Sequence, residues 1–361
     1  FGLTFINRGQ NKVKTKTVLA SFLVLIFTGI GLVEAKDKPL FERVVVFGES
    51  TSDIGNTWTL TGREIGGPTV WDPFDPSTLP TEPVPPLYDN GRWSNGPMWV
   101  EQLSERLGIR GRMTPSLDGG LNYAFTDALT GNGPNVRFSV WTGEPILNED
   151  WVPIYPVPGI GDQIEMYAAD EVTVNEDHLV VLWVGANEIL FSLESENPEA
   201  ALATAIGNNR LHVIELMELG AKHIIVPNHI YPSSSPFFAN NPIAQQAVQA
   251  ATAGFNALLA EMLQALMYEV EGDVTIYAMD FHALGEAVVE SECFDTETPA
   301  SFFYLGALAE GVPLEIDDPF FDNFVFWDTV HPTAAVHALL AKAAYKYIKK
   351  GKVPSFECSE E

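Results

Sequence analysis

The chain has 361 residues, and its 48 acidic against 20 basic side chains give a formal net charge of −28 at pH 7. A surface of this charge repels the phosphate backbone of nucleic acids, and no basic patch offsets it, so nucleic-acid partners are disfavoured. The two cysteines and seven histidines form no cluster at ligand spacing, so the sequence indicates no metal site.

The first 35 residues have the layout of a secretory signal peptide. Four basic side chains precede an apolar run over residues 18–33, and Val33-Glu34-Ala35 offers a cleavage point. The run is short for a membrane span. We therefore predict a signal peptide over 1–35 and a secreted or periplasmic domain over 36–361 with no stable membrane span, the alternative being an N-terminal membrane anchor. Cleavage leaves 16 basic and 47 acidic side chains.

The stretch from Val44 to Asn56 begins as a predicted buried strand. Four β-forming residues are followed by Gly48, which ends the strand and places Glu49 and Ser50 on a turn. Ser50 is then expected at the carboxyl end of a strand, where open α/β sheets bind ligands. Ser50 is a candidate nucleophile on this basis, and an ordinary turn serine is the alternative.

Two long segments without regular periodicity follow, over residues 61–87 and 131–159. Between them the sequence predicts a helix over 98–107 and a short strand over 121–125. Both segments follow predicted strands, so they are expected at the same edge of the sheet as Ser50. Unpatterned loops of this length are commonly binding loops, and we predict that these two line the substrate pocket rather than decorate the surface.

From residue 160 onward helices and strands alternate regularly. Strands separated by helices predict a parallel sheet with helices on both faces, which is a three-layer αβα sandwich in a single α/β domain. A third irregular segment is expected over 292–323. The predicted strands cover 178–184, 223–226, 274–279 and 324–326, and the predicted helices cover 162–169, 198–219, 243–270, 283–289 and 333–348.

An aspartate and a histidine lie three residues apart at the start of the last helix, in Asp328-Thr329-Val330-His331-Pro332. A serine nucleophile needs a base to take its proton and a group that orients this base, so His331 and Asp328 complete a candidate triad with Ser50. The remaining histidines have no comparable context and are interpreted as structural or surface residues: His178, His212, His223, His229, His282 and His337.

The chain resembles the GDSL-type SGNH hydrolases over residues 43 to 348, in the branch with secreted bacterial lipases, lecithinases, haemolysin-like phospholipases and plant GDSL lipases. This resemblance implies the SGNH hydrolase fold with its flavodoxin-like sheet, and an exported esterase or lipase that forms an acyl-enzyme on Ser50 without cofactor or metal. The blocks that carry it, in order, are Gly48-Glu49-Ser50 with Ser52-Asp53 and Gly55-Asn56, Asn90 to Gly96, Leu121 to Ala124, Gly185 to Glu188, Gly220 to Lys222 with Val226 to Asn228, and Asp328 to Thr333.

The resemblance also implies the donors of an oxyanion hole: the backbone N–H of Ser50, the side-chain amide of Asn187 and a backbone N–H at Asp127. This chain departs from the family pattern nearby, with Glu49 and Glu188 in place of aspartates and Thr126-Asp127 in place of two glycines. A carboxylate beside a developing oxyanion costs electrostatic stabilisation unless it points away.

The sequence leaves several alternatives open. The substrate is expected to be a small-molecule or lipid ester, but a carbohydrate acetylesterase, an acyltransferase and a catalytically weakened binding protein of the same fold are alternatives. The intact Ser50, Asn187, Asp328 and His331 favour an enzyme. Whether Cys293 and Cys358 form a disulfide between the body and the tail stays open as well.

Overall fold

The computed structural model describes residues 40–63, 83, 86–109, 111–133, 157–170, 176–230, 235–270, 273–351 and 356. They belong to one compact unit, Pro39–Glu361. The predicted signal peptide over 1–35, most of the segments 61–87 and 131–159, and Cys358 lie outside the described residues. Cys293 is disulfide-bonded.

The described residues contain one sheet of four parallel strands in the order β1-β2-β3-β4. The predicted strand over 121–125 lies along the other edge of β1 but forms only a bridge, in which Val46 N donates to Leu121 O (2.9 Å) and Tyr123 N to Val46 O (2.7 Å). In chain order this gives 2-1-3-4-5, the flavodoxin-like order that was predicted. The strands are β1 Arg43–Gly48, β2 His178–Trp183, β3 His223–Pro227 and β4 Thr275–Met279.

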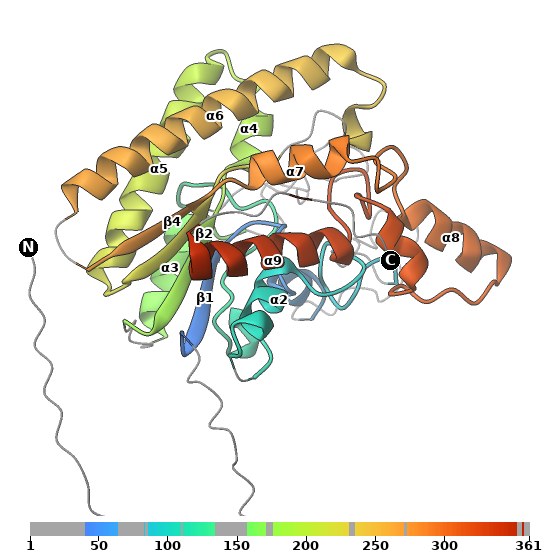
Figure 1. The fold of residues 1–361 in the computed structure, drawn as a ribbon, viewed down its shortest axis with the longest axis horizontal. Helices are drawn as coiled ribbons and strands as arrows, with labels where there is room; N and C mark the ends of the chain where they lie inside the picture. The colour runs from blue at the N-terminus through green and yellow to red at the C-terminus, as the bar shows by residue number, and fades with distance from the viewer. Residues whose placement is uncertain are drawn as a thin grey trace, which may run out of the picture. The chain divides into compact units, whose positions relative to one another are not determined.

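Helices cover both faces of this sheet (Figure 1), which confirms the predicted three-layer arrangement. One layer consists of α3 Ile160–Ala169, α5 Pro198–Glu218 and α6 Pro242–Glu269. The other consists of α2 Trp99–Arg106, α7 Phe281–Glu290 and α9 Ala334–Lys350.

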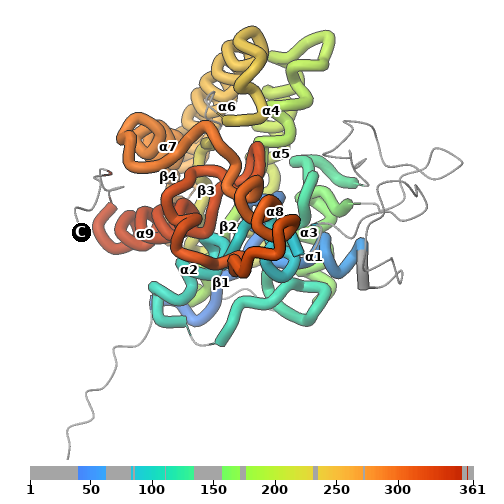
Figure 2. The backbone as a smooth tube through the Cα atoms, turned by 90° about the vertical axis from the view of Figure 1, so that its right-hand side faces the viewer, coloured from blue at the N-terminus to red at the C-terminus, as the bar shows by residue number. Residues whose placement is uncertain are grey.

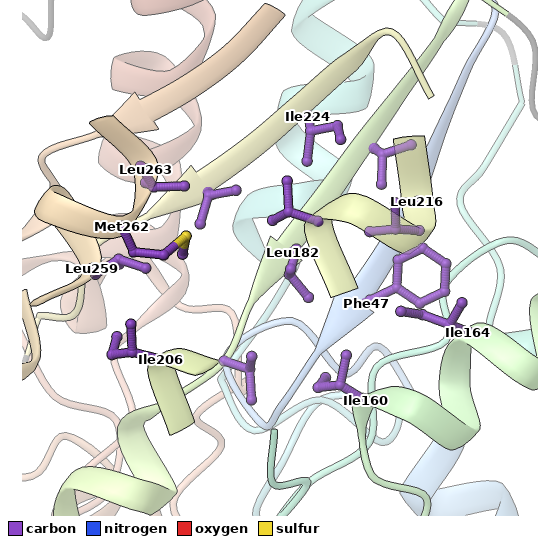
Figure 3. Packing of buried hydrophobic residues seen from close by; sticks show 14 of the residues in the cluster. Phe47, Ile160, Ile164, Leu182, Ile206, Leu216, Ile224, Leu259, Met262 and Leu263 are labelled. Atoms are coloured by element: carbon purple, nitrogen blue, oxygen red, sulfur yellow. The ribbon is translucent and has the colours of Figure 1, made fainter. Parts of the chain in front are cut away.

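Strands β1 and β2 are buried on both faces, as their continuous apolar sequences predict. In β1, Val45 and Phe47 pack against the α3, α5 and α6 layer, whereas Val44 and Val46 pack against the opposite layer. This alternation follows from the period of two along a strand. Figure 3 shows Phe47 among side chains of the first layer.

The prediction of a sheet strand over 324–326 is wrong. Phe324 and Phe326 make only isolated bridges, with Asp295 and Pro332. Neighbouring loop segments bind this backbone, since Val325 N donates to Asp295 O (2.9 Å) and Thr333 N to Val325 O (3.0 Å). The short apolar run is buried by side-chain packing, and burial alone does not distinguish it from a sheet strand.

The segment 292–323, predicted to be irregular, contains helix α8 Ser301–Glu310 and the 3₁₀ helix η4 Pro319–Asn323. The sequence of α8 is apolar on nearly all sides and therefore lacks the period of 3.6 that reveals an amphipathic helix. No helix in the described ranges is long and apolar enough to cross a membrane. The other short elements are α1 Asn56–Trp58, η1 Thr59–Arg63, η2 Ser116–Asp118, α4 Ala186–Ser192 and η3 Pro236–Phe238.

Candidate active site

Ser50 stands on a turn directly after β1. The side chain of Gln163 pairs with the backbone of Gly48, whose N–H donates to Oε1 (3.0 Å) and whose carbonyl accepts from Nε2 (2.9 Å). The backbone N–H of Ser52 then donates to Glu49 O (2.8 Å), which closes the turn around Ser50. A Cβ at Gly48 would lie 2.7 Å from Trp183 O, so the close approach of β2 requires glycine here.

Asp328 and His331 form a preassembled pair. His331 Nδ1 lies 2.7 Å from Asp328 Oδ2, and the backbone N–H of His331 donates to Oδ1 (2.6 Å). The Tyr88 hydroxyl donates to Oδ2 (2.7 Å), and the Trp93 ring lies 4.9 Å from the imidazole. Because Nδ1 is bound to Asp328, Nε2 is the ring nitrogen left for a substrate or nucleophile.

The charge of Asp328 suits this pairing. Burial raises the pKa of its carboxyl, but the nearby His331 and the hydrogen bonds from His331 and Tyr88 outweigh burial, and the net pKa lies below the ordinary value. Burial, followed by the charge of Asp328, raises the pKa of Tyr88 well above its ordinary value, so its hydroxyl stays a donor. Sequence reasoning missed Tyr88, which belongs to none of the motif blocks, whereas Trp93 lies within one.

Asn187 lies in the first turn of α4, directly beyond β2. Its Nδ2 donates to Glu49 Oε2 (2.9 Å) and to Ala128 O (3.0 Å). The amide that the family resemblance assigns to the oxyanion hole therefore has both N–H groups directed at protein acceptors in this structure. Helix α4 itself was not predicted, because its seven residues are too few to show a period.

Two glutamates lie around Asn187, one buried and one partly buried. Glu49, which is 1% exposed, also accepts from the backbone N–H of Ala186 (3.2 Å). Burial and, second, the charge of Glu188 raise the pKa of Glu49 to about 8. Glu188 accepts from the backbone N–H of Thr130, and burial raises its pKa as well. The two departures from the family's aspartates are therefore neighbouring acids, of which Glu49 is fully buried and Glu188 partly buried.

Asp127 adopts a φ of 61°, in the left-handed region that favours glycine. Burial raises the pKa of its carboxyl to about 7, with His331 lowering it and Asp53 raising it. Asp53 joins the turn after β1 to the segment that follows residues 121–124, since its Oδ2 accepts from Thr126 N (3.1 Å) and its Oδ1 from Gly55 N (2.9 Å). Asp127 is therefore fixed in a strained conformation that glycine adopts without cost.

The candidate residues from the sequence line one cavity of about 650 Å³: Ser50, Asp127, Asn187, Asp328 and His331. Apolar side chains of α4, α7 and α8 form much of its wall, such as Phe191, Leu284 and Phe302. Leu87 is the described residue that the segment 61–87 contributes, so the role of both predicted binding loops remains a prediction. Within the described ranges no group of three or more His, Cys, Asp or Glu side chains is placed to hold a metal ion.

Two of the histidines predicted to be structural are bound within the core. His229 also lines the cavity, but its Nε2 lies 2.8 Å from Val184 O and burial lowers its pKa to about 4. His337 Nδ1 accepts from the backbone N–H of Trp99 (3.3 Å), and burial lowers the pKa of His337 to about 3. Neither ring is a neutral-range base in these surroundings.

The flavodoxin-like order places this cavity where doubly wound α/β enzymes bind their substrates, beyond the carboxyl ends of β1 and β2. Residues 44–344 match the GDSL-like Lipase/Acylhydrolase family, so the chain belongs to that family, and the predicted class of ester hydrolase is confirmed.

Two relatives are similar over most of the chain. The phosphatidylcholine-sterol acyltransferase of Aeromonas hydrophila is 27% identical over 87% of this chain and 92% of its own length. A GDSL esterase/lipase of Arabidopsis thaliana is 26% identical over 82% of this chain and 84% of its own. Among solved structures, a catalytic mutant of an acetylxylan esterase from Geobacillus stearothermophilus aligns with a TM-score of 0.42 and 13% identity, over 88% of this chain and 97% of that one.

Proposed function

We propose that the chain is an exported serine hydrolase that cleaves carboxylic esters through an acyl-enzyme on Ser50. The observation that carries this proposal is the Asp328–His331 pair, formed at 2.7 Å on the wall of the cavity that Ser50 also lines. A pair that is already hydrogen-bonded holds one imidazole nitrogen on the carboxylate and offers the other as a base.

In this mechanism Ser50 Oγ attacks the ester carbonyl carbon while its proton passes to His331 Nε2. Asp328 stabilises the imidazolium that forms. The tetrahedral oxyanion binds the backbone N–H groups of Ser50 and Asp127 and the amide of Asn187. Collapse breaks the bond to the leaving alcohol, which takes the proton from His331, and an activated water then releases the acid.

The oxyanion hole requires Asn187 to redirect one N–H group from Glu49 or Ala128. Glu49 accepts a weaker hydrogen bond when its carboxyl group is protonated than when it is ionised, because hydrogen bonds to a charged carboxylate are stronger. The raised pKa of Glu49 therefore favours release of Asn187 at neutral pH.

The apolar wall of the cavity favours an ester with a long acyl chain, such as a lipid. Acyl transfer to an alcohol other than water is the second candidate, because one relative is a phosphatidylcholine-sterol acyltransferase. Both reactions share the acyl-enzyme, and they differ in the acceptor that resolves it.

Purified protein tested on nitrophenyl esters of graded chain length, phospholipids and acetylated sugars would test the proposal. We expect turnover that favours longer chains, a new ester product if an added alcohol is an acceptor, and no turnover by Ser50→Ala. Ser195→Ala, an exposed serine beyond α4, is the matched control. Normal turnover by Ser50→Ala would refute the assignment. Export is tested separately, by the N-terminal sequence of protein recovered outside the producing cell.

A further inference from the structure

Helix α8 exposes apolar side chains that monomeric soluble proteins normally bury. Ser301 and Tyr304 are its only buried residues, and no charged side chain occurs in residues 298–309. A contiguous apolar surface of this kind marks an interaction site. We call this feature the α8 surface, and its members are Phe302 (58% exposed), Phe303 (45%), Leu305 (41%) and Leu308 (44%).

The α8 surface is continuous with the candidate active site. Phe302 and Leu305 are exposed and also line the cavity, and so does Phe237 of η3, which is 57% exposed. Apolar side chains from two separate elements therefore connect the outside of the molecule with the cavity. In the end-on view, α8 faces the viewer in front of the sheet (Figure 2).

Both elements are attached to the turn that carries the candidate base. The backbone N–H of Ser301 donates to Trp327 O (2.8 Å), next to Asp328. On the other side, the backbone N–H of Phe237 donates to Thr329 O (3.0 Å), and the Ser235 hydroxyl donates to the same oxygen (2.7 Å). A partner that covers the α8 surface therefore lies beside the turn over residues 327–331, here called the catalytic turn, which carries the candidate base His331.

The charge around the α8 surface limits its partner. No lysine or arginine occurs anywhere in residues 223–341, which include η3, α7, α8 and the catalytic turn. The end of α8 and the chain beyond it expose Glu310, Glu315 and Asp317 instead. An anionic membrane is repelled by such a region, whereas a neutral or zwitterionic lipid surface is not. A second copy of the chain on this surface would lie over the apolar residues at the cavity rim.

We propose that the α8 surface and Phe237 dock onto a neutral or zwitterionic lipid surface, such as one of phosphatidylcholine, and that the acyl chain enters the cavity between them. This proposal rests on the proposed function, because it supplies the lipid ester to that site. Apolar side chains of a surface helix bind in this way when they enter the boundary between headgroups and acyl chains.

The test compares two double variants of the full chain in a Ser50→Ala background, so that the vesicles stay intact. Phe303→Gln/Leu308→Gln alters the α8 surface without changing a cavity-lining residue. Leu211→Gln/Tyr268→Gln, on exposed positions of α5 and α6, is the matched control. Flotation with phosphatidylcholine vesicles should show binding reduced about tenfold or more for the first variant and unchanged for the second. Parental binding to phosphatidylglycerol vesicles should be weaker.

With Ser50 present, both variants should hydrolyse a dissolved short-chain nitrophenyl ester at the parental rate, which shows that they are folded. Because Phe303 packs on Phe324 at 5.4 Å, the single variant Leu308→Gln is the second test should the double variant fail this check. Equal vesicle binding by the surface and control variants would overturn the docking proposal and leave the proposed function intact. Vesicle binding through α8 by a parental chain that hydrolyses no ester would refute the proposed function alone. A dimer that dissociates in the α8 variant would show a self-contact instead and overturn lipid docking.

Discussion

Asp328 and His331 lie three residues apart and are connected by hydrogen bonds within their own turn. The side of the cavity that we propose binds the oxyanion, called the oxyanion side, comprises Ser50, Asp127 and Asn187 and is assembled from three segments that are far apart in the sequence. Buried carboxyl groups hold this second side together, with Glu49 against Asn187 and Asp53 against Thr126.

This difference separates the two sides in their response to pH. The Asp328 carboxylate has a lowered pKa and stays ionised throughout the neutral range. On the oxyanion side, the pKa of Asp127 is raised to about 7 and that of Glu49 to about 8. The base side, which comprises Asp328 and His331, therefore keeps a fixed charge on its orienting carboxylate. The charge of the oxyanion side, in contrast, changes between about pH 6 and 9, the range set by the pKa values of Asp127 and Glu49.

The largest expected effect is on the base side. Asp328→Asn keeps an oxygen for the backbone N–H groups of Val330 and His331 but places an amide against His331 Nδ1 and the Tyr88 hydroxyl. The imidazole then loses its acceptor and the stabilisation of its charged form, and kcat should fall about a thousandfold or more.

Steady-state kinetics with a dissolved ester measure this effect. Asp295→Asn is a matched control, because Asp295 accepts the backbone N–H groups of Glu297 and Thr298 in a similar turn and does not line the cavity. A near-parental rate for Asp328→Asn would show that another group orients His331, and the contrast between the two sides would fail.

Glu49→Gln tests the oxyanion side through stability. A folded-state pKa above the unfolded value means that the protein loses stability as pH rises from the unfolded pKa, about 4.3 for glutamate, to the folded value of about 8. The variant lacks this loss, so its free energy of unfolding relative to the parent should rise across that window. One pKa unit corresponds to about 1.4 kcal/mol, so the rise should be at most a few kcal/mol.

Chemical denaturation at pH 5 and pH 8 measures the change, and Glu194→Gln is the control because Glu194 is exposed. A difference between Glu49→Gln and parent that is the same at both pH values would show that Glu49 is ionised throughout. The raised pKa and the release of Asn187 would then both be wrong.

The smallest expected effect is at Asp127. Asp127→Gly should raise kcat by about two- to fivefold with little change in KM, because the backbone donor stays while a nearby negative charge is removed. Glycine also adopts the observed φ of 61° without strain. The gain should grow as pH rises through about 7, where the wild-type carboxyl ionises.

Asp127→Asn, which tolerates positive φ and has no charge, separates the two contributions in pH–rate profiles. It should share the gain at pH 8 if charge is the cause. Abolished activity in Asp127→Gly would give the side chain a positive role and contradict the position proposed for the oxyanion hole. An unchanged rate would place Asp127 outside that hole.

Much of the fold was predictable because local patterns determine it. The apolar runs of β1 and β2 and the glycine at position 48 predict a nucleophile turn at a strand end, and the spacing of Asp328 and His331 predicts their pairing. Helix α8 was not predictable, since its uniform apolarity shows no helical period. Tyr88 and Gln163 were missed because their contacts join segments 240 and 115 residues apart.

The central claim is that Ser50 forms the covalent intermediate. The most direct test treats the purified chain with a fluorophosphonate probe and maps the modified peptide by mass spectrometry. We predict a single adduct on Ser50, which is absent from Ser50→Ala and formed more slowly in Asp328→Asn, because the probe reacts with an activated serine. An adduct on another residue, or labelling that persists in Ser50→Ala, would contradict the account.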